Sequence, residues 1–231
     1  MTSYKAVIPA AGQGSRMKAG KNKQFIMIEQ DPLLVHTLRV YQEDSSCSGI
    51  VISVNPDEMD AVRTLIQETG ITKVEHVTAG GKERQESVHL GLKCLTGNPV
   101  VLIHDGARPF IEQDCIHSIV NAVAPAVGAV AGVPVKDTIK RTLDGEVTET
   151  LKRDELWSIQ TPQGFLLQDI LQAHLKAERD GFPATDDASV FEYAGYPVKV
   201  VPGSYTNIKV TTPEDLILAE AILRARRKGE S

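Results

Sequence analysis

The stretch Ala6-Val7-Ile8-Pro9-Ala10-Ala11-Gly12-Gln13-Gly14-Ser15-Arg16-Met17 predicts both the fold and the place where a ligand binds. An apolar run gives way to small residues and glycines, an arginine follows, and Lys23 comes a few residues later. Backbone N–H groups in a chain rich in Gly and Ala can approach an anion closely, and Arg16 and Lys23 can add positive charge there. We therefore expect a buried strand that ends in a phosphate-binding loop.

Two familiar phosphate-binding motifs do not fit this loop. The dinucleotide fingerprint G-x-G-x-x-G requires glycine at position 17, where Met17 stands. The Walker A motif fails as well, because Gly20-Lys21 is followed by Asn22 and position 15 is a serine rather than a glycine. A G-x-G also occurs in ordinary turns, so the loop by itself indicates an anion site of unspecified kind.

Composition and charge narrow the class of protein. The chain has 231 residues, of which 42% are hydrophobic and 24% charged, as in ordinary globular proteins. A net charge of −5 argues against broad nucleic-acid binding, which needs a basic face. The three cysteines lie far apart without a C-x-x-C, and there is neither a signal-peptide pattern nor an apolar run long enough for a membrane span. We expect a cytoplasmic protein without nucleic-acid or membrane partners.

Short apolar segments alternate with helix-like segments along much of the chain. This alternation predicts an α/β fold with a mostly parallel, twisted sheet and helices on both faces. We expect residues 1–231 to form a single domain. The expected strands are 5–9, 49–54, 71–78, 100–104, 198–201 and 207–210; the expected helices are 33–43, 56–70, 83–95, 114–123, 167–179, 187–194 and one that begins at Pro213 after the N-cap Thr212.

The segment after residue 130 has a different pattern. Residues 134–141 and 146–153 are β-like and flank Asp144-Gly145, a dipeptide that favours a hairpin turn. A hairpin of this kind has little core of its own, and an isolated hairpin is only marginally stable in water. We expect a β-arm at about 134–153 that packs either on its own body or on a second subunit.

A second segment places charged residues at the end of another strand. Asp105 follows the apolar run 100–103, and Arg108 comes three residues later. Ligands of open α/β sheets bind beyond the carboxyl ends of the strands, where Asp105 would meet the glycine loop. A carboxylate beside phosphates can hold Mg²⁺, and Arg108 could pair with a second anion. His104, in the same buried run, is interpreted as a structural residue rather than a ligand.

Several motifs together resemble one enzyme family. In chain order the motifs are Pro9-Ala10-Ala11-Gly12-x-Gly14-x-Arg16-Met17, Lys23-Gln24, His104-Asp105-Gly106-Ala107-Arg108-Pro109, Asp137-Thr138-Ile139-Lys140-Arg141, Thr161-Pro162-Gln163 and Asn207-Ile208-Lys209-Val210-Thr211. The combination is similar to the 2-C-methyl-D-erythritol 4-phosphate cytidylyltransferases of the non-mevalonate isoprenoid route. The blocks 137–141 and 207–211 narrow the match, since the other motifs are shared with nucleotidyltransferases more widely.

The resemblance implies a Rossmann-like nucleotidyltransferase fold, a homodimer built through the 134–153 arm, and CTP as a substrate with Mg²⁺ or another divalent cation. It implies that the cytidylyl group passes to 2-C-methyl-D-erythritol 4-phosphate, which gives 4-diphosphocytidyl-2-C-methyl-D-erythritol and pyrophosphate. It also implies residue roles. The nucleotide would contact Ala10, Ala11, Gly12, Gly14, Gly81, Ser87, Asp105 and Gly106, with Asp105 also at the metal; Arg108, Thr161 and Thr185 would contact the second substrate, and Thr138 and Arg153 would reach it from the partner subunit.

The residue types suit such a reaction because it needs no general base. A phosphate monoester is already largely dianionic near neutral pH, since its second pKa is about 6. The difficulty is repulsion between this nucleophile and a triphosphate, which cations and fixed N–H dipoles relieve. Arg16, Lys23 and Mg²⁺ would stabilise the transition state and the leaving pyrophosphate. Lys209 and Arg153 would hold the attacking phosphate.

Other interpretations stay open at this point. The acceptor could be another polyol phosphate, such as ribitol 5-phosphate, because only the second pocket would differ. A non-catalytic nucleotide-binding module would bind CTP without releasing pyrophosphate. The pair Asp186-Asp187 beside Thr185 could be a carboxylate pair in a site, but a helix N-cap is the favoured interpretation.

Overall fold

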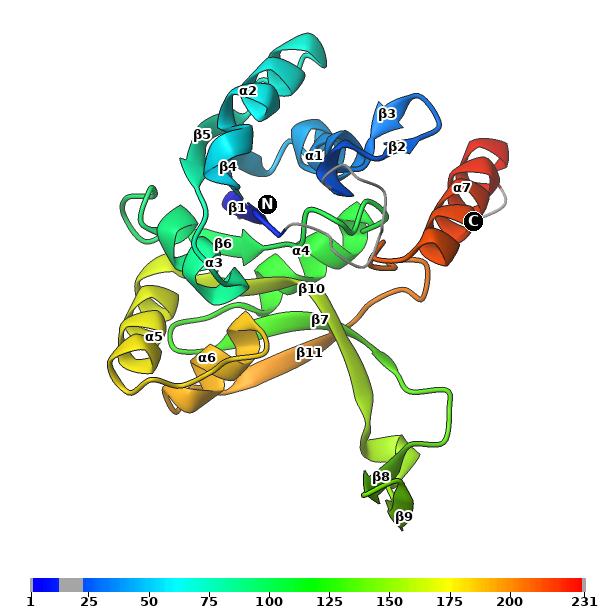
Figure 1. Cartoon of the computed structure of the whole chain (residues 1–231). Coiled ribbons are helices and arrows are strands. Elements are labelled where there is room, and N and C mark those ends of the chain that lie inside the picture. The colour runs from blue at the N-terminus through cyan, green and yellow to red at the C-terminus, as the bar shows by residue number, and fades with distance from the viewer. Residues whose placement is uncertain (1, 13–22, 230–231) are drawn as a thin grey trace.

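The computed structural model describes residues 2–12 and 23–229, and a seven-stranded sheet lies at their centre (Figure 1). Its strands are β1 (Tyr4–Ala10), β4 (Cys47–Val54), β5 (Val74–Ala79), β6 (Val100–Ile103), β7 (Gly128–Pro134), β10 (Trp157–Leu166) and β11 (Val198–Pro202). Their order across the sheet is β11-β7-β10-β6-β1-β4-β5. Neighbours run parallel except where β10 pairs with β6 and with β7. The mostly parallel sheet that the sequence predicts is confirmed.

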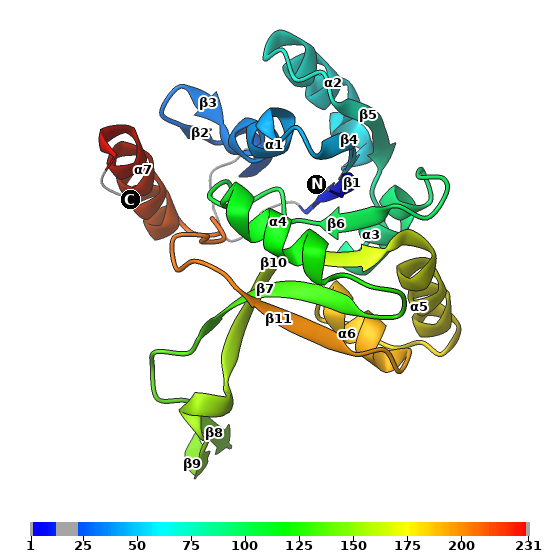
Figure 2. The ribbon, with the colours of Figure 1, turned by 180° about the vertical axis from the view of Figure 1, so that it is seen from behind.

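Helices cover both faces of the sheet (Figures 1 and 2). The helices α1 (Leu33–Glu43), α2 (Met59–Glu68) and α4 (Gln113–Ala122) pack on one face, and α3 (Arg84–Leu92), α5 (Leu167–Arg179) and α6 (Asp187–Tyr193) pack on the other. Successive side chains of a strand point to opposite faces, so both faces of a central strand must be apolar when helices cover both. This double burial explains why the central parallel strands appear in the sequence as unbroken apolar runs.

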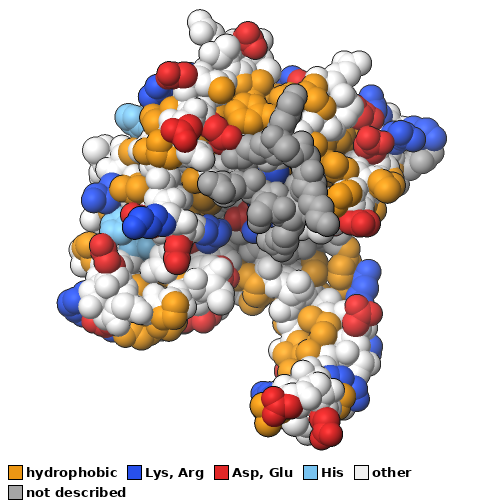
Figure 3. All heavy atoms as spheres, viewed as in Figure 1, with side chains coloured by type: hydrophobic (Ala, Val, Ile, Leu, Met, Phe, Trp, Pro, Cys, Tyr) orange, Lys and Arg blue, Asp and Glu red, His pale blue; other side chains and the backbone are white. Residues whose placement is uncertain are grey.

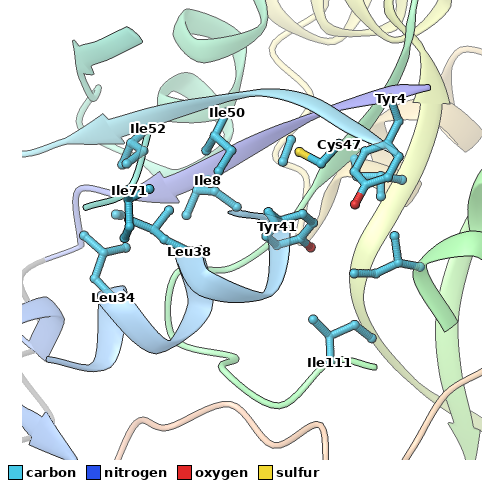
Figure 4. Packing of buried hydrophobic residues seen from close by; sticks show 14 of the residues in the cluster. Tyr4, Ile8, Leu34, Leu38, Tyr41, Cys47, Ile50, Ile52, Ile71 and Ile111 are labelled. Carbon is cyan, nitrogen blue, oxygen red and sulfur yellow. The ribbon is translucent and has the colours of Figure 1, made fainter. Parts of the chain in front are cut away.

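Strand β1 illustrates the two cores. Its Ile8 joins the cluster that contains α1, α2 and α4, whereas Val7 joins the cluster that contains α3 and α5. Figure 4 shows the first cluster, in which Ile8 lies between Ile50 of β4 and Leu38 of α1. All of these side chains are fully buried, so the strand that leads into the glycine loop is fixed from both sides.

The expected β-arm is present. It consists of β8 (Lys140–Leu143) and β9 (Glu146–Thr150), which pair antiparallel across the turn Asp144-Gly145. Both turn residues have positive φ angles, 50° and 85°, as a type I′ hairpin turn requires. The arm stands away from the body of the molecule, and every residue of its two strands is exposed (Figure 1).

Two further strands and one further α-helix complete the strands and α-helices of the described residues. They are the two short strands β2 (Met27–Ile28) and β3 (Asp31–Pro32), which pair with each other, and the C-terminal helix α7 (Pro213–Lys228). The predicted N-cap of α7 is confirmed, because the Thr212 side chain accepts a hydrogen bond from the backbone N–H of Asp215 and Asp215 binds back to Thr212. In the described part of the chain, none of the helices has the length and apolar character that a membrane crossing requires.

The structure corrects several of the expected elements. Strands β2, β3, β7 and β10 were not expected, and residues 207–210, expected as a strand, are irregular. Glycine is required in β7, because a Cβ on Gly128 would lie 2.7 Å from the ring of Phe165. In β10, Pro162 falls in a register irregularity between Ile159 and Gln163, where the pairing with β7 is interrupted.

Candidate active site

A pocket opens where strands β1 and β6 end at the carboxyl edge of the sheet. It is lined by the loop after β1, by the turn and first residues of α3, by the chain after β6, and by Lys209. Nine residues that the sequence singled out meet there. These are Ala10, Ala11, Gly12, Lys23, Gly81, Ser87, Asp105, Gly106 and Lys209.

Asp105 is the most strongly constrained charge in this pocket. Its Oδ1 lies 3.0 Å from Nε of Arg84, and its Oδ2 lies 2.7 Å from Nζ of Lys209 and 3.7 Å from Nε of Arg108. Burial raises the pKa of the Asp105 carboxyl, but Arg84 and Lys209 outweigh burial and hold the pKa well below its usual range. Asp105 is therefore ionised throughout the neutral range and oriented by cations on both of its oxygens.

Arg84 is a site residue that the sequence analysis did not identify. It is the first residue of α3, and its guanidinium also lies 2.8 Å from Oδ2 of Asp187. A cation in the first turn of a helix interacts unfavourably with the helix dipole. This unfavourable position is the feature of the sequence from which a role for Arg84 could have been predicted. Burial lowers the pKa of Arg84, but the two carboxylates outweigh it and raise the pKa above its ordinary value.

The neighbouring residues Asp186 and Asp187 have different roles. Asp186 caps α6, because its side chain accepts the backbone N–H of Ser189 in a capping box, and the N-cap interpretation is confirmed for this residue. Asp187 points inward instead, is 1% exposed, and pairs with Arg84. Asp187 therefore belongs to the charge cluster beneath the pocket.

The walls of the pocket are held by hydrogen bonds between neighbouring segments. The Gln24 side-chain amide, next to Lys23, donates to the carbonyl of Ala10. The backbone N–H of Gly81 donates to Oγ of Ser87, 3.0 Å away. A Cβ on Gly80 would lie 2.4 Å from Cβ of Ala11, so only glycine lets these two loops approach so closely. Both loops thus expose backbone to the pocket at short range.

His104 and Thr161 support Asp105 from behind. The Thr161 hydroxyl oxygen accepts the backbone N–H of Asp105 at 3.0 Å and lies 3.1 Å from Nδ1 of His104. The other ring nitrogen of His104 lies 2.8 Å from the carbonyl oxygen of Arg108. Desolvation by burial lowers the pKa of His104 to about 4, so the ring is neutral and the structural role predicted for it is confirmed.

Several expected site residues lie elsewhere. Arg108 is beside Asp105, and its Nη1 donates to the carbonyl of Asn207, although Arg108 is not among the residues that line the pocket. Thr185 is exposed in the loop before α6. Thr138 and Arg153 are exposed on the arm, where one chain alone does not bring them to its own pocket. The expected nucleotide contact Gly14 and the catalytic candidate Arg16 lie outside the described residues.

The donors in the pocket suit a metal that arrives with phosphates. Among the described residues, no three His, Cys, Asp or Glu side chains gather closely enough to hold a metal by themselves. The pocket instead offers the buried carboxylate of Asp105, with Glu83 also on its wall. Mg²⁺ is usually held by one or two carboxylates together with substrate phosphates and water, so this donor set fits a nucleotide-bound Mg²⁺.

Comparison with known proteins agrees with this geometry. Residues 4–225 match the family model described as 2-C-methyl-D-erythritol 4-phosphate cytidylyltransferase. A protein of that name from Halalkalibacterium halodurans is 53% identical over 225 residues, which are 97% of this chain and 99% of the relative. One from Bacillus velezensis is 52% identical over 224 residues, 96% of each chain. The chain belongs to the 2-C-methyl-D-erythritol 4-phosphate cytidylyltransferase family.

Solved structures support the same assignment. The cytidylyltransferase from Thermus thermophilus superposes with a TM-score of 0.78 at 31% identity, over 97% of this chain and 100% of that one. The 4-diphosphocytidyl-2C-methyl-D-erythritol synthase from Anaerococcus prevotii superposes with a TM-score of 0.82 at 30% identity, over 96% of each.

Membership of the cytidylyltransferase family assigns the reaction. The chain is a nucleotidyltransferase that transfers the cytidylyl group of CTP to 2-C-methyl-D-erythritol 4-phosphate, in the synthesis of isoprenoid precursors. Of the functions that the sequence left open, this one is favoured over transfer to ribitol 5-phosphate and over a non-catalytic module.

Proposed function

We propose that the cytidylyl transfer takes place in the pocket between the loop after β1 and the end of β6, with residues 1–231 acting as a single domain. The observation that carries this proposal is the convergence of Lys23, Lys209 and the buried, ionised Asp105 on one pocket at the carboxyl edge of the sheet. Two cations and a carboxylate in one concave site suit a reaction between two phosphate groups.

The nucleotide is assigned to the backbone-rich side of the pocket. Ala10, Ala11 and Gly12 offer backbone to the triphosphate, and the Gly81–Ser87 turn lies where the base would sit. Gly106 follows Asp105 at the floor, next to the ribose. Arg16 and Gly14, which lie outside the described residues, would complete the loop around the phosphates.

The second substrate is assigned to the side on which Lys209 lies. Lys209 would hold the attacking phosphate of methylerythritol phosphate, and Arg108 and Thr185 would approach its polyol. Thr161 would serve this side of the pocket through the backbone of Asp105, which its hydroxyl holds. The attack is in line on the α-phosphorus, and no residue needs to remove a proton because the nucleophile is a phosphate oxygen. Lys23 and Arg16 would stabilise the charge that builds on pyrophosphate.

Asp105 is proposed to hold Mg²⁺, or another divalent cation, against the nucleotide phosphates. The ion would neutralise charge between the two reacting phosphate groups. In the described structure Oδ2 of Asp105 is paired with Lys209 and Oδ1 with Arg84. A carboxylate whose pKa is held low keeps its charge, and hence its affinity for a cation, at every pH at which the enzyme works.

The β-arm is proposed to join two subunits into a homodimer. Large apolar side chains are exposed on it and at its base, and Figure 3 shows apolar and charged side chains side by side along its length. Leu143 is 68% and Val147 60% exposed in the single chain, which favours burial against another surface. Thr138 and Arg153 would then reach the partner's pocket.

The free thiols of all three cysteines support a reducing, cytoplasmic location.

The experiment is an assay of pyrophosphate release from CTP and 2-C-methyl-D-erythritol 4-phosphate with Mg²⁺. We expect Lys23→Ala and Lys209→Ala each to lower kcat by about 10²–10³-fold, the loss typical of removing one donor to a developing charge. Lys5→Ala is the matched control, because Lys5 pairs with Glu75 at 2.6 Å far from the pocket. Turnover of Lys23→Ala at the wild-type rate would remove Lys23 from this role.

A further inference from the structure

Arg84 joins two buried carboxylates that come from distant parts of the chain. Its Nε contacts Oδ1 of Asp105 at the end of β6, and its Nη1 contacts Oδ2 of Asp187 at the start of α6. The side chain of Asp105 is 9% exposed and that of Asp187 is 1% exposed. The guanidinium therefore links the floor of the pocket to the start of α6.

The Asp187 end of this link is firmly anchored. The Gln163 side chain of β10 donates to Asp186 at 2.7 Å and accepts the backbone N–H of Ala188 at 2.9 Å. These bonds fix the first turn of α6 to the sheet. His174 of α5, also fully buried, lies 3.6 Å from Oδ1 of Asp187 on the side away from Arg84.

At the other end of the link, the two oxygens of the Asp105 carboxylate contact different cations. Arg84 holds Oδ1, whereas Oδ2 faces Lys209, the residue assigned to the attacking phosphate. The backbone of Asp105 is fixed separately by the Thr161 hydroxyl. The remaining freedom is rotation of the carboxylate, which Arg84 restrains at Oδ1 while Lys209 contacts Oδ2.

Stability alone does not account for such a cluster. Buried ion pairs often contribute no more to folding than well-packed apolar side chains of similar volume would. The planar fork of Arg84 presents N–H groups in fixed directions to two separate carboxylates, whereas the ammonium of a lysine is a compact charge without that fixed geometry. Arg84 also lines the catalytic pocket, so its orientation is transmitted directly to the reacting region.

We propose that Arg84 and Asp187 are positioning residues, which hold the Asp105 carboxylate so that Oδ2 stays directed at Lys209 and the bound phosphates. Asp187 acts only through Arg84, and Arg84 acts through Asp105. This inference rests on the role proposed for Asp105 in the pocket and adds the two residues that orient it.

The test is a double-mutant cycle in which Arg84→Lys, Asp187→Asn and the double variant are compared with the wild type in the pyrophosphate assay. Each single variant is expected to lower kcat by about 10²-fold, the loss that a misplacement of roughly 1 Å produces, with KM for CTP changed less than about 3-fold. The double variant is expected to match Arg84→Lys within about 2-fold, because the link is already broken in that variant. Arg39→Lys is the matched control, since Arg39 contacts Asp31 through two hydrogen bonds far from the pocket.

Three results would overturn the inference: unchanged kcat in the folded single variants, a loss confined to KM, or losses that multiply in the double variant. Thermal melting identifies folded variants. Arg84→Lys leaves a cation between the two buried carboxylates, so its kcat and KM decide the question if Asp187→Asn does not fold. Asp105→Asn is assayed in parallel. Full activity of Asp105→Asn would contradict the role of Asp105 itself. If kcat falls in Asp105→Asn but not in the Arg84 and Asp187 variants, only the positioning role of Arg84 and Asp187 is contradicted.

Discussion

At the scale of single residues, the charged side chains of the pocket come from distant segments of the chain: Arg84 from the start of α3, Asp105 from the chain after β6, and Lys209 from the irregular segment before α7. Asp105 follows an apolar run, and Lys209 sits in a recognisable motif, so both could be assigned before the structure was known. Arg84 lies 21 positions before Asp105, and nothing in its neighbourhood specifies which carboxylate it meets. Pairing of that kind depends on how α3 packs on the sheet, which is a property of the tertiary fold.

The buried imidazole of His104 carries the first prediction at this scale. Burial lowers its pKa to about 4, whereas an exposed histidine titrates near 6.5, so the unfolded chain binds more protons between these pH values. The free energy of unfolding should therefore fall as pH falls through this window, by about 3 kcal/mol from this group alone.

The measurement is chemical denaturation of the wild type and of His104→Asn at several pH values from 7 to about 4. The difference between the two proteins isolates His104, because other titrating groups are common to both. The wild type should lose stability relative to the variant as the pH falls. Parallel pH profiles would show that His104 keeps an ordinary pKa in the folded protein.

At the scale of elements, helices and turns that depend on local sequence were predicted correctly, whereas strands whose conformation depends on tertiary packing were missed. The helix 33–43, the hairpin turn at Asp144-Gly145 and the cap Thr212 follow from periodicity and turn chemistry. Strand β7 is rich in Gly and Ala, with Gly128 against the ring of Phe165 and Gly132 against Val200 and Ile159, and β10 contains a proline, so both lack the usual signature of a strand. Their strand conformation comes from pairing with neighbours.

The irregular segment 203–210 carries the second prediction. Residues 207–210 of this segment were expected as a strand, but the segment is held by Asn207, whose side chain donates to Oε1 of Gln160 at 3.1 Å and to the carbonyl of Thr161 at 2.9 Å. Asn207→Ala would leave these acceptors buried without a donor, so unfolding should become easier by about 2 kcal/mol. Because Lys209 is two residues away, kcat should fall as well.

The control is Gln42→Ala. The Gln42 side chain also binds the backbone of a neighbouring segment, through the N–H groups of Thr72 and Lys73, which lie just before β5 and do not line the pocket. This variant should lose stability and keep kcat. Equal kcat in both variants, measured with folded protein, would show that the segment does not position Lys209.

At the scale of the whole molecule, the arm is the feature that a single chain does not explain. It stands away from the body (Figure 1). Its apolar side chains are exposed, and the two residues expected to serve the site from it, Thr138 and Arg153, are not among those that line the pocket of their own chain. The sequence predicted the arm from its hairpin pattern, and the proposed homodimer would cover the arm with a second copy of the chain.

Complementation between subunits tests this arrangement, with Lys209→Ala and Arg153→Ala co-expressed under different tags. If Arg153 serves the partner's pocket, each mixed dimer has one pocket with both wild-type residues. Random assortment should then restore about a quarter of wild-type kcat, since half of the dimers are mixed and each has one intact site. Co-expression of Lys209→Ala with Lys23→Ala is the control and should restore nothing, because both residues act in the body of their own chain. Recovery no greater than this control would place Arg153 in its own subunit or outside catalysis.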